Sequence, residues 1–241
     1  MARIRLFVEH PLGEAQQVPL SREQAHYLFG VMRLSTGNEV ALFNGTDGEW
    51  LADVAEAGKR GGTLACREQT QPQWMPPDLT LYFAPIKKAR TDFIVEKAVE
   101  MGVRRIVPVQ TDFTNSERIR QDRLQAHAVE AAEQCGAVYV PEVTALVKLG
   151  QVLRDWSDDA QLMFCDEALA GEMQKADFGA QPKDAPWGIL IGPEGGFSDA
   201  ERARLHGMAQ SVPVRLGPRI LRADTAAVAA LTIWQTTYGD W

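Results

Sequence analysis

Two short segments carry the residue types that could do chemistry. The first, IGPEGGFSDAE, runs from Ile191 to Glu201, and the second, LGPRILRADTA, runs from Leu216 to Ala226. Each reads as the end of a strand followed by a loop that begins a helix, which is where α/β proteins bind small molecules. In the second loop Arg219 and Arg222 flank an apolar Ile-Leu pair. We expect that pair to pack while the two guanidinium groups face an anion or a carboxylate.

The first loop does not fit three common kinds of site. A P-loop requires G-x-x-x-x-G-K-[ST], but the position five residues after Gly192 is Phe197. Neither Gly192 nor Gly195 begins the G-x-G-x-x-G of a dinucleotide site, and Ala200 breaks the G-x-S-x-G of a serine hydrolase. The glycines therefore indicate either tight turns or positions where a ligand approaches the main chain.

Helix starts follow both loops. Ser198 and Glu201 have the S-x-x-E spacing of a capping box, so Ser198 is expected to cap a helix rather than act as a nucleophile. After the second loop we expect Asp224 or Thr225 to cap the next helix.

The chain has 241 residues, of which 45% are hydrophobic, and this is enough for one or two globular domains. No apolar run approaches the roughly 20 residues that span a bilayer, and the first residues do not resemble a secretory signal, so we expect a cytoplasmic protein without a membrane partner. The net charge of −7 argues against indiscriminate coating of nucleic acid. The widely spaced Cys66, Cys135 and Cys165 indicate no disulfide framework and no metal site, and we expect buried thiols.

The pattern of the chain changes near residue 75. Residues 1–72 alternate short apolar runs with glycine turns, which predicts a small β-rich domain in which only Ala25–Arg33 reads as helical. A proline-rich linker follows, and residues 76–241 alternate strand-like and helix-like stretches. The runs QLMFCDE and WGILIGPE are typical of parallel strands covered on both faces. The second domain is therefore predicted to be α/β, with helices on both faces of its sheet.

The spacing of apolar residues predicts two helices in this second domain. One buries a face made of Leu124, Ala128, Ala131, Ala132 and Cys135, and the other is expected in LVKLGQVLRDW. Between Pro85 and Arg123 nine Lys or Arg residues stand against six Asp or Glu, which gives this segment a net charge of +3. This segregation favours a local basic surface.

Both loops resemble the C-terminal motifs of the bacterial 16S ribosomal RNA (uracil-N3)-methyltransferase family, the RsmE-like members of the SPOUT superfamily. The similarity extends to KKARTDFIVEKAVEMGV, FTNSER and EAAEQCG, and to RLF and HYLFGVMRL near the N-terminus, so it covers nearly the whole chain. Two residues depart from the family pattern. Ala137 stands where Arg is frequent, and Asp224 stands where Glu is usual.

The resemblance implies a PUA-like β-barrel that helps to hold RNA, followed by a SPOUT α/β domain with a C-terminal trefoil knot, in a homodimer. It implies S-adenosylmethionine as cofactor and N3 of a uridine in the 16S rRNA of the small subunit, in the decoding region, as methyl acceptor. Another RNA target, or a catalytically silent RNA-binding protein of the same fold, stays open.

The resemblance also assigns site residues. The cofactor-binding set lies at the strand end 164–167 and in the two loops: Asp166, Ile191, Gly192, Pro193, Glu194, Gly195, Gly196, Leu216, Gly217, Ile220, Leu221 and Arg222. Arg219, Arg222 and Arg118 are the catalytic candidates, because cations would stabilise charge developing on the uracil, and Lys88 is a further available cation. Expected RNA contacts are Arg3, Arg33, Lys87, Lys88, Arg90, Arg104 and Arg105. Asp92, Lys97 and Glu100 fit a salt-bridged helix face as well as they fit catalysis.

Overall fold

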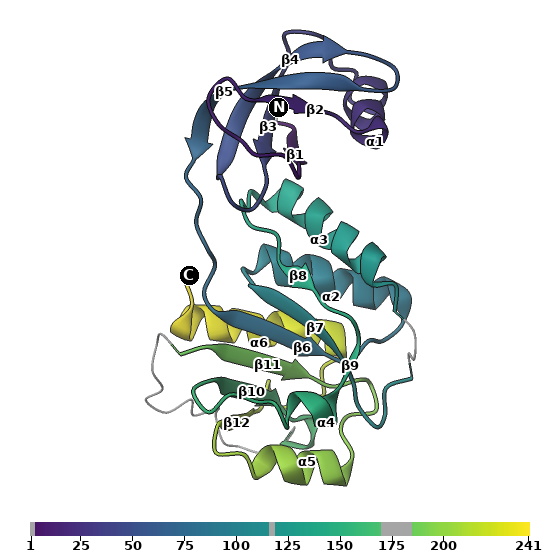
Figure 1. The fold of residues 1–241 in the computed structure, drawn as a ribbon. Coiled ribbons are helices and arrows are strands. Elements are labelled where there is room, and N and C mark those ends of the chain that lie inside the picture. Colours follow the sequence, from purple (N-terminus) through teal and green to yellow (C-terminus); the bar gives the residue numbers. More distant parts are fainter. Residues whose placement is uncertain (1–2, 116–118, 170–184) are drawn as a thin grey trace. The chain divides into compact units, whose positions relative to one another are not determined.

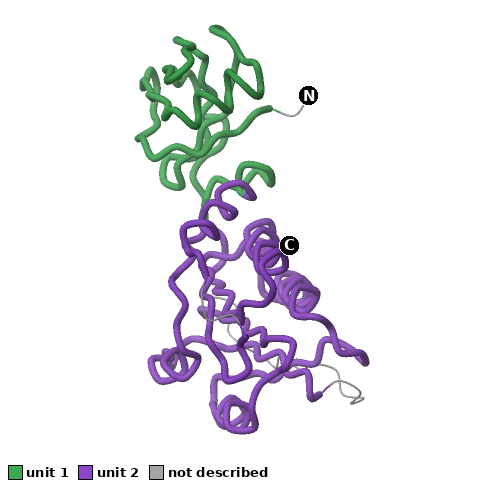
Figure 2. The backbone as a smooth tube through the Cα atoms, turned by 90° about the vertical axis from the view of Figure 1, so that its right-hand side faces the viewer, with its two compact units in different colours: residues 1–75, 132–140 green, residues 76–131, 141–241 purple. Residues whose placement is uncertain are grey.

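A computed structural model describes residues 3–115, 119–169 and 185–241. The chain divides into two compact units, shown in different colours in Figure 2. The first comprises residues 1–75 and 132–140, and the second comprises residues 76–131 and 141–241. Each unit has its own core and is described by itself.

The first unit is built on a five-stranded sheet with the strand order β1-β3-β4-β5-β2. β1 runs parallel to β3, and the other pairs are antiparallel. Four consecutive residues of β3, from Val40 to Phe43, are buried, and Ala52 and Val54 of β4 are buried as well. The strands are β1 (Arg5–Phe7), β2 (Gln17–Pro19), β3 (Glu39–Phe43), β4 (Glu49–Ala57) and β5 (Gly62–Gln71). The small β-rich domain predicted from the glycine turns is thus present.

The segment expected to be helical over Ala25–Arg33 is helical in most of that range. α1 (Arg22–Ala25) follows the N-cap residue Ser21, whose hydroxyl accepts from the amide of Gln24 in a capping box. The chain then continues as a π-helix, η1 (His26–Val31). A π-helix has hydrogen bonds between residues five apart, and it occurs mostly as single turns within α-helices.

Arg5 links this sheet to the carboxyl end of α3 (Gln121–Cys135). Its Nε lies 2.7 Å from Oε2 of Glu49, and its Nη atoms donate to the main-chain carbonyls of Ala132, Glu133 and Ala137. The two side chains of the ion pair are only 11% and 7% exposed. Charges so far removed from water depend on one another, because either alone would be buried without a partner.

The second unit contains a seven-stranded sheet in which β12-β10-β11-β6-β7-β8 lie in that order and β9 also pairs with β7. Every pair in it is parallel, which confirms the prediction made from the apolar runs. All five residues of β11 are buried. The strands are β6 (Leu79–Phe83), β7 (Arg105–Gln110), β8 (Glu142–Val143), β9 (Val147–Lys148), β10 (Gln161–Cys165), β11 (Trp187–Ile191) and β12 (Ser211–Val214).

Helices cover both faces of this sheet, as predicted (Figure 1). α2 (Lys88–Glu100) and α6 (Ala223–Tyr238) share one face, where Trp234 of α6 packs on Trp187. On the other face, Leu149 of α4 (Leu149–Val152) and Leu205 of α5 (Asp199–His206) join the cluster around Leu190. The helix predicted in LVKLGQVLRDW is wrong beyond these four residues, because Val147 and Lys148 near its start instead form strand β9 beside β7.

The cysteine prediction holds in part. Cys66 and Cys165 are buried free thiols, whereas Cys135 is exposed at the end of α3. The apolar spacing correctly predicted burial of Leu124 and Ala128 on that helix, but the stripe ends before Cys135. In the described residues no helix is long and apolar enough to cross a membrane.

Candidate functional site

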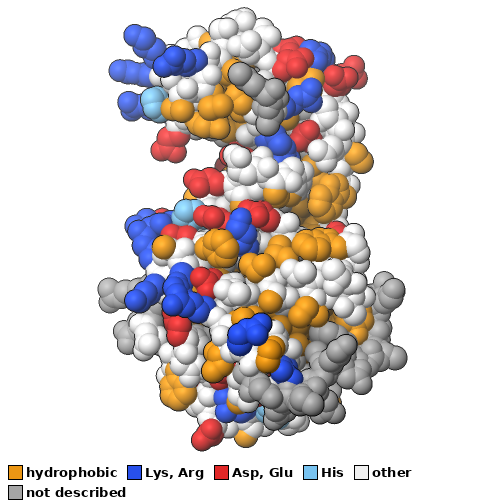
Figure 3. Space-filling view, turned by 180° about the vertical axis from the view of Figure 1, so that it is seen from behind, with side chains coloured by type: hydrophobic (Ala, Val, Ile, Leu, Met, Phe, Trp, Pro, Cys, Tyr) orange, Lys and Arg blue, Asp and Glu red, His pale blue; other side chains and the backbone are white. Residues whose placement is uncertain are grey.

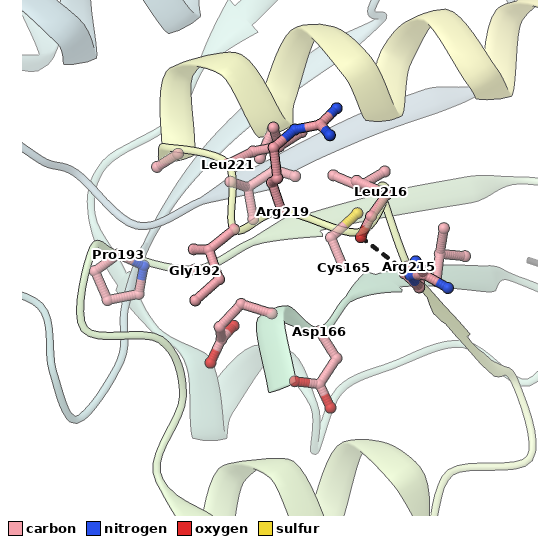
Figure 4. A pocket seen from close by; sticks show the side chains of 15 residues that line it. Cys165, Asp166, Gly192, Pro193, Arg215, Leu216, Arg219 and Leu221 are labelled. Carbon is pink, nitrogen blue, oxygen red and sulfur yellow. Dashed lines mark hydrogen bonds between the residues drawn. The ribbon is translucent and has the colours of Figure 1, made fainter. Parts of the chain in front are cut away.

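A pocket lies beyond the carboxyl ends of β10, β11 and β12 (Figure 4). Parallel strands all end at the same edge of a sheet, so three segments far apart in the sequence meet there. The pocket is lined by Cys165, Asp166, Glu167, Ile191, Gly192, Pro193, Val214, Arg215, Leu216, Gly217, Arg219, Ile220, Leu221, Ala223 and Ala226. Both loops singled out in the sequence therefore contribute to one cavity.

The first loop is held against the core by Phe197. This ring is 3% exposed and meets Phe164 of β10 edge-on, with 5.1 Å between the ring centres. A Cβ atom on Gly192 would lie only 2.7 Å from the Phe197 ring. Glycine is therefore required at position 192 by the closeness of this packing. The capping box of Ser198 and Glu201 at the start of α5 is confirmed.

Gly196 makes a second close approach. Its φ of +71° lies in the left-handed region, and a Cβ atom there would overlap Oε1 of Glu167. The same Oε1 accepts a hydrogen bond from the amide of Phe197, at 3.3 Å. The residue that follows Asp166 thus touches the loop that follows β11, and two of the three segments that line the pocket are joined directly.

The second loop turns at Gly217, whose φ is +131°. Nε of Arg215 donates to the carbonyl of Gly217 at 3.0 Å and holds the turn. In the described part of the chain, the main-chain N–H groups of Leu216 and Leu221 donate to no acceptor. Backbone donors left unpaired in a protein are satisfied by water or by a ligand. The loop therefore presents donors and apolar side chains side by side.

The two arginines of this loop remain accessible. Arg219 lines the pocket, and Figure 4 shows its side chain on the opposite side of the cavity from Asp166. Arg222 is the N-cap residue of α6 and makes no side-chain cap, so the prediction that Asp224 or Thr225 caps this helix is wrong. Asp224 instead approaches Nε of Arg90 at 3.8 Å. The expected packing of the apolar pair is not seen for Ile220, which is 74% exposed.

The carboxylate of Asp166 points away from the pocket, towards α5. Its side chain is 1% exposed, and its Oδ2 lies 2.9 Å from Nε2 of His206. Its Oδ1 accepts from the amide of Ala168 and lies 3.3 Å from Nε of Arg202. The carboxylate of Asp166 thus contacts residues of α5, and other atoms of Asp166 line the cavity.

Most of the predicted cofactor residues line the pocket: Asp166, Ile191, Gly192, Pro193, Leu216, Gly217, Ile220 and Leu221. Glu194, Gly195, Gly196 and Arg222 belong to the same loops but are not on its walls. Sequence reasoning missed Val214, Arg215, Ala223 and Ala226. The small side chains at 223 and 226 are spaced to share one face of the first turn of α6, and this spacing could have identified them. Arg118 lies outside the described residues.

The structure places the predicted RNA contacts in different environments. Arg3, Arg33, Lys87, Lys88 and Arg105 are exposed. Arg90 approaches Asp224, as described above, and Arg104 donates to the carbonyl of Pro76 at 3.0 Å from Nε. On the face shown in Figure 3, basic side chains of the second unit lie next to acidic ones.

The helix face with Asp92, Lys97 and Glu100 is a salt-bridged one. Nζ of Lys97 lies 2.6 Å from Oε1 of Glu100, and Nη2 of Arg123 lies 2.6 Å from Oδ2 of Asp92. Each of the three side chains thus has an ion-pair partner. In the described parts of the chain, no group of three or more His, Cys, Asp or Glu residues is placed to hold a metal ion.

Burial raises the pKa of the Cys165 thiol at the pocket wall. A thiol held protonated in this way is a poor nucleophile, since the thiolate is the reactive form. The chemistry of the pocket therefore depends on its main-chain groups, its carboxylates and its arginines.

Comparison with known proteins defines the class first. Residues 74–235 match the RNA methyltransferase domain family, and residues 20–64 match the RNA methyltransferase PUA domain family. The fold and the site are thus those of an RNA methyltransferase domain preceded by a PUA domain.

Individual relatives narrow the class. Ribosomal RNA small subunit methyltransferase E of Synechocystis sp. is 31% identical over 218 residues, which cover 89% of this chain and 71% of the relative. The Rickettsia conorii protein of the same name is 28% identical and covers 94% of this chain and 93% of its own length. The crystal structure of that enzyme from Neisseria gonorrhoeae, bound to S-adenosylmethionine, superposes with a TM-score of 0.90 at 25% identity over 99% of both chains. The chain belongs to the ribosomal RNA small subunit methyltransferase E family.

Proposed function

We propose that this protein is an S-adenosylmethionine-dependent methyltransferase that methylates N3 of a uridine in the 16S rRNA of the small ribosomal subunit, in the decoding region. The observation that carries the proposal is the pocket formed by two glycine-containing loops at the carboxyl edge of the parallel sheet. The Neisseria gonorrhoeae relative, which is alike over nearly the whole chain, was crystallised with S-adenosylmethionine.

The residues of the pocket fit this cofactor. The apolar side chains of Ile191, Leu216 and Leu221 offer surfaces for an adenine ring, and the unpaired amides of Leu216 and Leu221 offer donors to its ring nitrogens. Close approach of the main chain is secured at Gly192, where a side chain would collide with Phe197. The loop thus offers main-chain groups to the cofactor and contains no P-loop lysine.

The bound cofactor supplies a methyl group on a positively charged sulfur. The chain contributes position and electrostatics, because transfer needs the acceptor nitrogen held in line in a site shielded from water. Arg219 and Arg222 are the described cations nearest in sequence to the apolar pair of the loop, and each would stabilise negative charge that develops on the uracil as N3 loses its proton. Arg118 is proposed for the same role. The uridine must leave its stacked position to reach the loops.

The proposal extends to the two domains. Residues 1–72, with the exposed Arg3 and Arg33, would hold RNA. Residues 76–241 would carry catalysis, and their exposed Lys87, Lys88 and Arg105 would also contact RNA. We infer that the protein acts as a homodimer in the cytoplasm. The trefoil knot remains a prediction.

The proposal is tested by transfer of labelled methyl groups to small subunits from a strain that lacks the enzyme, followed by nucleoside analysis. We expect 3-methyluridine. A different labelled nucleoside would contradict the proposed acceptor. Absence of transfer, combined with S-adenosylmethionine binding in calorimetry, would contradict this acceptor as well, and absence of binding would identify an RNA-binding protein that has lost catalysis.

A matched pair of variants tests the catalytic role of the loop. Arg219→Gln is expected to lower kcat by about 100-fold, on the scale of removing one charge-stabilising donor, with little change in the KM for the cofactor. Arg204→Gln removes an exposed arginine of α5 that donates to the carbonyl of Gly150. It should leave kcat unchanged, and equal loss in both variants would contradict the assignment.

A further inference from the structure

Arg202 of α5 spans two consecutive carboxylates behind the pocket. Its Nη2 lies 2.9 Å from Oε1 of Glu167, and its Nε lies 3.3 Å from Oδ1 of Asp166. Asp166 and Glu167 both line the pocket, whereas Arg202 does not. The guanidinium of Arg202 therefore does not line the pocket, but it contacts the carboxylates of two residues that do.

Glu167 carries this contact on to the first loop. Oε1 of Glu167 accepts from Arg202 and also from the amide of Phe197, at 3.3 Å. Gly196 adopts a left-handed conformation against that carboxylate, and no side chain would fit between them. The Glu167 carboxylate thus contacts the main chain at 196–197, four to five residues after Gly192, and adds to the hold of the buried Phe197 ring on this loop.

The ion pair between Arg202 and Glu167 is partly shielded from water. The side chains of Arg202 and Glu167 are 27% and 32% exposed, so water screens their attraction only in part. Asp166 is almost fully buried, and its charge requires the partners that α5 provides in Arg202 and His206. Without Arg202, the Glu167 carboxylate would lose its cation and be free to turn towards water.

We propose that Arg202 is a positioning residue, which acts through Glu167 to hold the loop from Gly192 to Phe197 in the conformation that binds the cofactor. This inference rests on the proposed function, because it assigns a partner to the cofactor pocket. Through Glu167, Arg202 of α5 would thus connect the end of β10 to the loop that follows β11. It predicts that cofactor affinity depends on a side chain that does not contact the cofactor.

Arg202→Gln and Arg204→Gln form a matched pair on one helix, two residues apart. Arg202→Gln is expected to raise the KM and Kd for S-adenosylmethionine by roughly 5- to 150-fold, the range of a coupling between neighbouring elements, with kcat at saturation within about twofold of wild type. Arg204→Gln should leave both constants unchanged. Unchanged affinity in Arg202→Gln, or the same loss in both variants, would overturn the proposal.

Two further measurements separate positioning from a general loss of structure. Glu167→Gln should reproduce the loss, and the double variant should lose little more than either single one, because both substitutions break the same link. Additive losses would overturn the proposal. Arg202→Lys keeps one charged contact and should restore part of the affinity, and it also serves as the test if Arg202→Gln does not fold.

A readout without cofactor distinguishes this inference from the proposed function. The amide of Phe197 donates to Glu167, so its hydrogen exchange should accelerate in Arg202→Gln and not in Arg204→Gln. If no S-adenosylmethionine binds to the wild type, the proposed function fails while this exchange experiment still reports on the link. Unchanged exchange at Phe197 would refute the link itself.

Discussion

Gly192→Ala is expected to weaken cofactor binding without unfolding the protein. The added Cβ would lie 2.7 Å from one carbon of the Phe197 ring and 3.0 Å from the next, well inside van der Waals contact. The ring cannot swing away, because it is 3% exposed and packed edge-on against Phe164. Relief must therefore come from a shift of the loop that lines the pocket.

The magnitude follows from the cost of overpacking. Forcing an extra methyl group into a close-packed site costs about 1–3 kcal/mol. If the loop escapes that cost by moving, the binding conformation is disfavoured by the same amount, and Kd rises roughly 5- to 150-fold. Calorimetry with S-adenosylmethionine measures this change, and urea denaturation measures the accompanying loss of stability.

Gly150→Ala is the matched control for this prediction. It lies in α4 of the same unit, and its added Cβ would meet only a guanidinium nitrogen of Arg204 at an ordinary 3.7 Å. Alanine is the better helix former, so the control should bind normally and be as stable as wild type or slightly more so. If Gly192→Ala folds and binds within twofold of wild type, the contact between position 192 and the Phe197 ring does not control the cofactor-binding conformation.

Three further predictions concern stability and reactivity. Arg5→Ala leaves the buried Glu49 carboxylate without its cation and should cost about 3–5 kcal/mol in urea denaturation; a loss below about 1 kcal/mol would contradict the buried-pair reading. The hydrogen bond from Arg120 lowers the pKa of Asp122 from 3.8 to about 2, so the contribution of this pair to stability is complete above pH 3.8 and is lost as the pH falls through 2. A carboxyl titration by NMR that shows no upward movement of this pKa in Arg120→Gln would contradict that cause. Cys165, whose pKa is raised by burial, should resist iodoacetamide at pH 8 until the chain unfolds, and mass spectrometry showing rapid native labelling would disprove its burial.

Local sequence signals predicted the features that depend on local chemistry. The Ser198 capping box needed only the S-x-x-E spacing, and the parallel sheet needed only apolar runs of the right length. The N-cap of α6 was predicted incorrectly because the helix begins earlier, with Arg222 as its N-cap residue. Asp224 lies in the first turn, where its Oδ1 accepts from the amide of Thr225 and its Oδ2 lies 3.8 Å from Nε of Arg90. Pairing with β7 converts the start of the stretch expected to be a helix into β9, so there a tertiary contact overrides local preference.

Some residues of the candidate site could be recognised in the sequence, and others depend on contacts that only the fold creates. The glycines were recognisable because a missing side chain is visible in the sequence, although the reason for Gly192 is the buried Phe197 ring. Arg202 could not have been identified from spacing, because its role depends on α5 lying against the end of β10. Val214 and Arg215 carry no motif, and they reach the pocket only because β12 pairs with β10 and ends beside it.

A crystal structure of this protein with S-adenosylmethionine tests the assignment of the pocket most directly. We expect the adenine between the loop that begins at Ile191 and the loop from Leu216 to Leu221, with main-chain N–H groups as its donors. The contradicting result is the cofactor elsewhere, for example in the cavity of about 400 Å³ lined by Tyr82 and Trp156, with the two loops making no contact to it.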